Sequence, residues 1–131
     1  MIEICEINHK IYVTPKLHIS INERFLQQAI CKIEEKLDYD TFDFEKFACE
    51  MANSKSTLRR RIKLLTVLSP VDFIREIRLK YAILMLTSNS DSISEIAYSV
   101  GFNDPKYFSR CFKNEFGLGP KAFRENMRRL N

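Results

Sequence analysis

Basic side chains recur at matched positions in two parts of this 131-residue chain. Arg60 and Lys63 are followed, 50 residues later, by Arg110 and Lys113, and both pairs lie among apolar residues spaced three or four apart. Guanidinium and ammonium groups on one face of a helix bind anions, and arginine also makes paired hydrogen bonds to the edge of guanine. The chemistry that these residues offer is therefore the binding of a polyanion.

Helical geometry separates these residues from the expected core. At about 100° per residue, Leu58, Ile62 and Leu65 form one inner face, and Phe108 and Phe112 form the other. Arg61 falls near the core edge, and Tyr107 lies where it could snorkel at the rim of a ligand. The candidate binding residues that this geometry places outward or on the flank of each helix are Ser56, Arg59, Arg60, Lys63, Lys106, Ser109, Arg110 and Lys113.

The matched positions belong to an internal repeat. Residues 48–51 align with residues 97–100 at an offset of 49, and after one extra residue the offset becomes 50, as in Leu58/Phe108 and Pro70/Pro120. Short helices are not stable alone, so each repeat must bury its apolar faces in a small three-helix core. The chain therefore contains a helix-turn-helix followed by a further helix, twice.

Capping signals predict seven helices around this repeat. Ser20 with Glu23 and Ser92 with Glu95 fit capping boxes, and Ser69 followed by Pro70 begins a long helix with the expected apolar stripe Ile74, Ile77, Tyr81 and Leu84. Asn53 is expected to take the left-handed conformation that breaks the chain, and Asp43, Ser54 and Asp104 are expected to cap the helices that follow them. The expected helices cover residues 20–37, 44–51, 55–65, 70–87, 92–100, 105–116 and 120–130, which makes the body all-α.

Composition agrees with a compact domain and concentrates positive charge in one part. The chain is 45% hydrophobic and 29% charged. Residues 1–50 hold 6 basic and 10 acidic side chains, whereas residues 51–131 hold 15 and 7, which gives net charges of −4 and +8. This asymmetry favours a polyanionic partner for the later part.

Several function classes lack the residues that they require. The longest apolar run, residues 81–86, is far shorter than the roughly 18 residues of a membrane span, so we expect a cytoplasmic protein. Four scattered cysteines and two histidines, His9 and His18, give no zinc or disulfide spacing. With no phosphate-binding loop and no histidine beside a nucleophile, we expect neither an enzyme nor a cofactor.

A helix-turn-helix repeated in this way suits double-stranded DNA. A helix fits the major groove, and the second helix of such a motif turns its N-terminal half toward base edges. The connecting helix is about 25 Å long at 1.5 Å per residue. With its flanking units it could set two recognition helices near the roughly 34 Å that separates successive major-groove faces.

The signature in residues 93–113, ISEIAYSVGFNDPKYFSRCFK, strongly resembles the AraC/XylS family of transcription regulators. Phe116-Gly117, Gly119-Pro120 and residues 54–58 and 68–79 support the resemblance, which covers about residues 23–130. The segment that begins at Val13-Thr-Pro looks most like the output end of hybrid two-component regulators. The resemblance implies a bacterial, sequence-specific DNA-binding domain with homeodomain-like helix-turn-helix subdomains.

The resemblance also assigns roles to the candidate residues. It implies base-reading positions at Ser56, Arg59 and Arg60 in the first recognition helix and at Lys106, Ser109 and Arg110 in the second; Lys55, Lys63 and Lys113 suit phosphates. The chain departs from the family pattern at Ala52-Asn53, where many relatives have a glycine, and at Arg59, where the subfamily often has an aromatic. Pro105 leaves less polar readout at the start of the second recognition helix.

These observations predict an extended N-terminal linker at residues 1–22, where no helical period is present, and a DNA-binding domain at residues 23–131. The first helix-turn-helix unit spans about residues 43–68, the connecting helix about 70–87 and the second unit about 92–130. We expect a monomer in isolation, regulated by a sensor or receiver region outside this sequence. The alternative is a helical protein–protein interaction module whose basic faces are incidental; it predicts weak salt dependence of binding.

Overall fold

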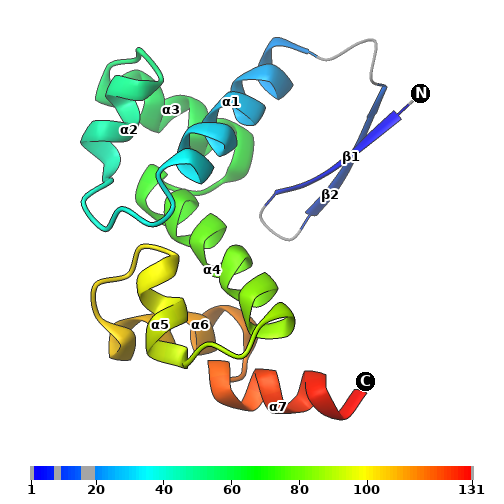
Figure 1. Cartoon of the computed structure of the whole chain (residues 1–131). Helices are drawn as coiled ribbons and strands as arrows, with labels where there is room; N and C mark the ends of the chain where they lie inside the picture. The colour runs from blue at the N-terminus through cyan, green and yellow to red at the C-terminus, as the bar shows by residue number, and fades with distance from the viewer. Residues whose placement is uncertain (1, 8–9, 16–19, 131) are drawn as a thin grey trace. The chain divides into compact units, whose positions relative to one another are not determined.

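The computed structural model describes residues 2–7, 10–15 and 20–130, and its body is all-α as predicted (Figure 1). Seven helices follow one another between Ser20 and Leu130, and that described stretch contains no strand. The elements are β1 (Ile2–Ile7), β2 (Lys10–Pro15), α1 (Ile21–Glu35), α2 (Phe44–Glu50), α3 (Lys55–Thr66), α4 (Pro70–Ser88), α5 (Ile93–Ser99), α6 (Pro105–Phe116) and α7 (Pro120–Leu130).

The N-terminal segment is extended, and it is also paired. β1 and β2 run antiparallel, with a register that extends from Ile2 opposite Pro15 to Ile7 opposite Lys10. The sequence predicts the extended backbone of this segment but not the pairing of its strands.

The predicted caps form at the helix starts. In the capping box of α5, the Ser92 hydroxyl accepts from the Glu95 amide at 3.1 Å, while the Glu95 carboxylate accepts from the Ser92 amide at 3.3 Å. Ser20 and Glu23 make the same exchange at the start of α1. Side-chain oxygens of Asp43, Ser54, Ser69 and Asp104 accept backbone amides at the starts of α2, α3, α4 and α6.

The chain divides into two compact units. The first comprises Met1–Glu35 and Asp43–Glu76, and the second comprises Lys36–Phe42 and Ile77–Asn131. α4 therefore supplies its first turns to one unit and its remainder to the other. In the first unit, the rings of Phe47 and Phe73 stack with centroids 6.4 Å apart. Its fully buried side chains come from α1 to α4: Ala29, Ile33, Phe47, Leu58, Ile62, Pro70 and Phe73.

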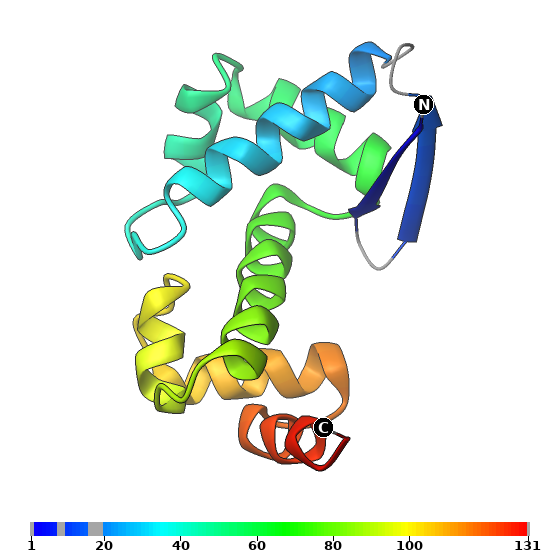
Figure 2. The same cartoon turned by 45° about the vertical axis from the view of Figure 1, so that its right-hand side comes forward.

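The core of the second unit is built around aromatic rings. α5, α6 and α7 gather around the second half of α4 (Figure 2). The ring of Phe112 lies 4.7 Å from Phe116 and 5.5 Å from Phe123, and Phe108 meets Phe102 edge-on at 5.2 Å between centroids. The predicted inner face of α6 is thus confirmed, because Phe108 and Phe112 are fully buried.

Backbone hydrogen bonds confirm the internal repeat. In the two turns, the Asn53 amide donates to Ala48 at 3.1 Å and the Phe102 amide donates to Ala97 at 2.9 Å. The helices end alike, with Val67 donating to Lys63 and Gly117 donating to Lys113. The offsets of 49 and 50 agree with the starts of α2 and α5, of α3 and α6, and of α4 and α7.

Three local predictions are wrong. The left-handed residue in the first turn is Ala52 (φ 53°) rather than Asn53, whose side-chain amide instead donates to the Met51 carbonyl at 2.6 Å. Leu84 is 58% exposed, because the second half of α4 buries a different stripe, formed by Leu79, Ala82 and Leu86.

The third error lies at the end of α3. Leu65 is only half-buried there, while Thr66 is buried and its hydroxyl donates to the Ile62 carbonyl at 2.7 Å. The hydrogen-bonding requirement of the Thr66 hydroxyl is thus met within the helix, which allows a polar residue to occupy the inner face.

Candidate nucleic-acid interface

α3 presents five of the predicted binding residues on its exposed surface. Ser54 caps the helix, and Leu58 and Ile62 fix its orientation by complete burial in the first unit. The structure leaves the opposite side chains exposed: Lys55, Ser56, Arg59, Arg60 and Lys63. The α3 surface is therefore cationic along the length of the helix.

α6 presents the other four residues in the second unit. Pro105 occupies the first turn after the Asp104 cap, and the buried rings of Phe108 and Phe112 set which side faces outward. Lys106, Arg110 and Lys113 are exposed, whereas Ser109 is half-buried. Exposure in α6 thus matches exposure in α3 at three pairs of repeat positions: Ser56/Lys106, Arg60/Arg110 and Lys63/Lys113.

Two cations of α3 have partners in α2, which sequence analysis missed. The Lys55 ammonium lies 3.0 Å from the Glu45 carboxylate, and both side chains are largely exposed. The Arg59 guanidinium lies over the ring of Phe44, 5.1 Å from its centroid. The spacing within each helix gives no sign of these contacts, because they depend on how α2 packs against α3.

The remaining cations are free to meet a ligand. Within the part of the chain that the structure describes, no side chain pairs with these five: Arg60, Lys63, Lys106, Arg110 and Lys113. Arg61 differs from them, since its guanidinium lies 3.7 Å from the centroid of the Phe25 ring. Its position at the core edge, expected from helical spacing, is confirmed.

Two arginines counted in the positive charge of the later part are buried and serve the fold. Arg78 is 6% exposed and donates to the carbonyls of Tyr39 at 3.1 Å, Phe42 at 3.1 Å and Val100 at 3.3 Å. Burial lowers the pKa of the Arg78 guanidinium, and the Asp40 carboxylate opposes that shift.

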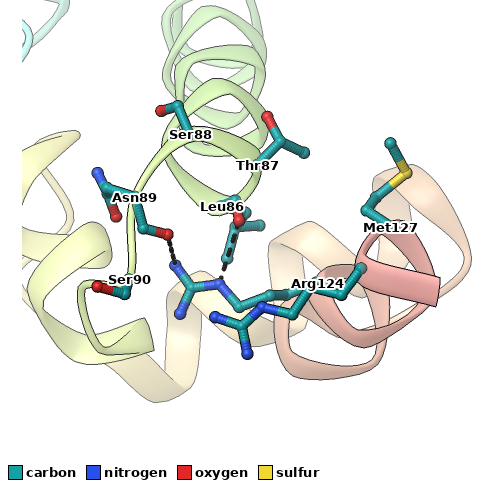
Figure 3. Close-up of a pocket in the computed structure, with 8 residues that line it drawn as sticks. Leu86, Thr87, Ser88, Asn89, Ser90, Arg124 and Met127 are labelled. Carbon is teal, nitrogen blue, oxygen red and sulfur yellow. Dashed lines mark hydrogen bonds between the residues drawn. The ribbon is translucent and has the colours of Figure 1, made fainter. Parts of the chain in front are cut away.

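Arg124 is 8% exposed and binds backbone carbonyls in the connection between α4 and α5 (Figure 3). It donates to the carbonyls of Leu86 at 3.1 Å, Asp91 at 2.6 Å and Asn89 at 3.4 Å. The guanidinium also lines a surface pocket of about 340 Å³ between the end of α4 and α7.

A sequence signal for both buried arginines exists. Arg78 lies four residues from Ile74 and from Ala82, and Arg124 lies four residues after Pro120, all of them buried. Helical spacing thus places both on inner stripes. Neither arginine is available to a polyanion.

The described residues offer no metal site. No group of three His, Cys, Asp or Glu side chains among them is placed to hold an ion, and Cys31, Cys49 and Cys111 are free thiols. His9 and His18 lie outside the described residues. No helix of the described chain has both the length and the apolar character that a membrane crossing requires.

The family described as "Helix-turn-helix domain" matches residues 47–126, which include α3, α6 and the turns before them. The chain belongs to the AraC/XylS family. It is 41% identical to histidine kinase P4 of Formosa agariphila over 104 residues, which are 79% of this chain and 8% of that protein. The chain therefore spans a small part of the length of this relative.

Solved structures of AraC-type domains share the fold. The C-terminal domain of AraT, a response regulator from Geobacillus stearothermophilus, is similar with a TM-score of 0.74 and 28% identity, covering 82% of this chain and 88% of that one. The DNA-binding domain of AdpA, a global transcriptional factor solved in complex with a target DNA, has a TM-score of 0.74 and 27% identity, covering 81% and 95%.

Proposed function

We propose that this AraC-type domain regulates transcription by sequence-specific binding to double-stranded DNA, with α3 and α6 entering two successive major-groove segments. The observation that carries the proposal is the duplicated cationic surface, in which Arg60 and Lys63 recur as Arg110 and Lys113, exposed and without partners in the described chain. The similarity to the DNA-bound AdpA domain supports it.

The proposed residues divide into two roles. Ser56, Arg59 and Arg60 of α3 and Lys106, Ser109 and Arg110 of α6 read base edges, because they stand in the outer N-terminal half or middle of each helix. Lys55, Lys63 and Lys113 bind phosphates, which an ammonium group contacts without regard to sequence. The ion pair with Glu45 must open before Lys55 meets a phosphate.

Selection of bound sequences from a random duplex pool tests the function directly. The selected duplex should bind more tightly than a scrambled one, and the affinity for both should fall steeply with salt as phosphate counterions are released. A helical protein–protein module with incidental basic faces would select no sequence and would respond weakly to salt. Failure to enrich any site would refute the proposal.

Two alanine variants separate the proposed roles. Arg110→Ala should cost about 1–3 kcal/mol on the selected duplex and relax base choice near its contact, because it removes a paired hydrogen bond. Lys63→Ala should weaken selected and scrambled duplexes equally and reduce the salt slope. Titrations at several salt concentrations measure both effects. Equal losses on the two duplexes for Arg110→Ala would make this residue a phosphate contact.

We also propose that the domain is the cytoplasmic output part of a two-component regulator. Its similarity to a histidine kinase and to a response-regulator domain supports this assignment. The isolated domain should be monomeric and span an asymmetric site, with control by phosphorylation residing elsewhere in the longer protein. Gel filtration of the domain checks the monomer, and a tight dimer would contradict it.

A further inference from the structure

The two buried arginines of the second unit make similar bonds but hold different parts of the chain. Each donates to three backbone carbonyls. Arg124 donates to carbonyls 33 to 38 residues away, in the connection between α4 and α5 at residues 86–91. Arg78 donates to carbonyls 22, 36 and 39 residues away, and two of these lie in the segment at residues 36–42, which connects α1 to α2. Both sets of bonds are long-range, but only those of Arg78 hold a segment that connects two helices of the first unit.

The site around Arg78 is fitted to the guanidinium. A Cβ placed on Gly101 would lie 1.6 Å from the Arg78 Nη1 atom and 2.4 Å from the Leu37 carbonyl. The turn of the second helix-turn-helix, the guanidinium and the segment at residues 36–42 are thus packed too closely to admit a methyl group. A buried guanidinium with its donors directed at carbonyls is costly to disturb, because each carbonyl would lose the hydrogen bond that Arg78 donates.

The segment that Arg78 holds has an unusual place in the chain. Lys36–Phe42 belongs to the second unit, but α1, which precedes it, and α2, which follows it, belong to the first. The chain therefore passes between the units after Glu35, after Phe42 and within α4 after Glu76. The first two of these connections link the two units firmly only while residues 36–42 stay attached to the second unit.

We propose that Arg78 is a positioning residue for two-site DNA binding, which fastens residues 36–42 so that three chain passages, rather than α4 alone, join the two helix-turn-helix units. The inference rests on the proposed function. A tighter connection raises the effective concentration of the second recognition helix once the first has bound, and it makes binding sensitive to the distance between half-sites. Arg78 itself contacts no DNA in this proposal.

Half-site spacing tests the role of Arg78. Arg78→Met is compared with the unmodified domain on the selected duplex, on duplexes with one, two or five base pairs inserted between half-sites, and on single half-sites. We expect about tenfold weaker binding to the selected duplex, unchanged half-site affinity and a flattened spacing dependence, as for two modules on a looser linker. Retention of the original spacing dependence would overturn the proposal.

Arg124→Met is the matched control. It removes an equally buried guanidinium with three carbonyl partners from the same unit, but it leaves residues 36–42 attached. Both variants should lower the melting temperature, and only Arg78→Met should alter spacing dependence. If Arg78→Met does not fold, Arg78→Lys takes its place, since one ammonium cannot span all three carbonyls and should give an intermediate effect. Equal spacing dependence in the Arg78 and Arg124 variants would overturn the proposal.

Hydrogen exchange separates this inference from the proposed function, because it needs no DNA. The Tyr39 and Phe42 amides, bonded to the Lys36 and Tyr39 carbonyls, should exchange at least about tenfold faster in the Arg78 variant than in the Arg124 variant. Faster exchange without any sequence-selective binding would refute the DNA function alone. Unchanged exchange together with normal sequence-selective DNA binding would refute the proposed role of Arg78 and leave the DNA function intact.

Discussion

The two helix-turn-helix units share one backbone pattern but meet its left-handed positions with different residues. Ala52 and Val67 have φ values of 53° and 68° in the first unit, whereas Gly101 and Gly117 have 92° and 81° in the second. Left-handed backbone costs a residue with a side chain about 1–2 kcal/mol, and glycine almost nothing. The fold therefore dictates the conformation, while the surroundings of each position decide whether a side chain is tolerated there.

Gly101→Ala gives the second turn the residue that the first turn has at the same position, Ala52, and it should produce the largest effect. Ala52 is exposed, so its methyl group points into solvent, but Gly101 is buried against Arg78 and Leu37. Overpacking together with backbone strain should destabilise the domain by about 3 kcal/mol or more. Urea denaturation followed by circular dichroism measures the change. The reciprocal Ala52→Gly variant should be neutral or slightly stabilising, and an equal loss in both would contradict this account.

Arg124→Ile gives the second unit the residue that the first has at the same repeat position, Ile74. Ile74 is buried without any need for a polar partner, whereas Arg124 satisfies three carbonyls between α4 and α5. The substitution should cost about 2–4 kcal/mol of unfolding free energy. Arg128, which lines the same pocket and is exposed, provides the control: its alanine variant should change stability by less than about 0.5 kcal/mol. Similar losses in both variants would show that the carbonyl contacts are unimportant.

Sequence alone predicted the features that depend on neighbours along the chain. Caps such as Ser54 and Ser92 bond within three residues, and the inner faces of Leu58 and Phe108 follow from helical spacing, so these predictions are confirmed. The outward cations of α3 and α6 follow from the same spacing. The exposure of these cations is confirmed, whereas Ser109 beside them is half-buried, and the DNA roles of all these residues remain predictions.

The predictions that failed depend on which elements pack together. The exposure of Leu84 arises because α4 serves two cores in turn, so no single stripe runs along it. The αL conformation of Ala52 in place of Asn53 reflects the hydrogen bond from the Asn53 amide to Ala48, which the turn requires whatever residue precedes it. Contacts of α2 with Lys55 and Arg59 likewise follow from tertiary packing.

Val67→Gly should make the first unit behave like the second at the end of its recognition helix. Val67 is β-branched, left-handed and 66% exposed, so its side chain gains little packing in return for the strain. Replacement by glycine should stabilise the domain by about 1 kcal/mol, after the extra entropy of the unfolded chain is subtracted. Gly117→Ala should cost about the same, since a Cβ there meets no atom within 4 Å and only strain acts. Opposite shifts in urea midpoint are expected, and a loss in both variants would indicate that Val67 packs usefully.

Phe44→Leu should have the smallest effect and tests whether the two recognition helices are supported differently. Phe44 lies under the Arg59 guanidinium, whereas the second unit has Ile93 and Ser109 at the matched positions and so lacks an aromatic support. An exposed contact of this type contributes about 0.5–1 kcal/mol, and its loss should weaken binding to the selected duplex about two- to fivefold by freeing Arg59.

A double-mutant cycle isolates the contribution of that support to binding. If Phe44 acts through Arg59, the two losses should not add: once Arg59→Ala is present, Phe44→Leu should have no further effect on affinity, whereas it should act fully beside Arg60→Ala. Ile93→Leu serves as the control in the second unit and should leave affinity unchanged. Additive losses for Phe44 and Arg59 would mean that the ring stabilises α2 alone, and the two helices would then differ only in the residues they present, because neither would have its arginines positioned by a neighbouring helix.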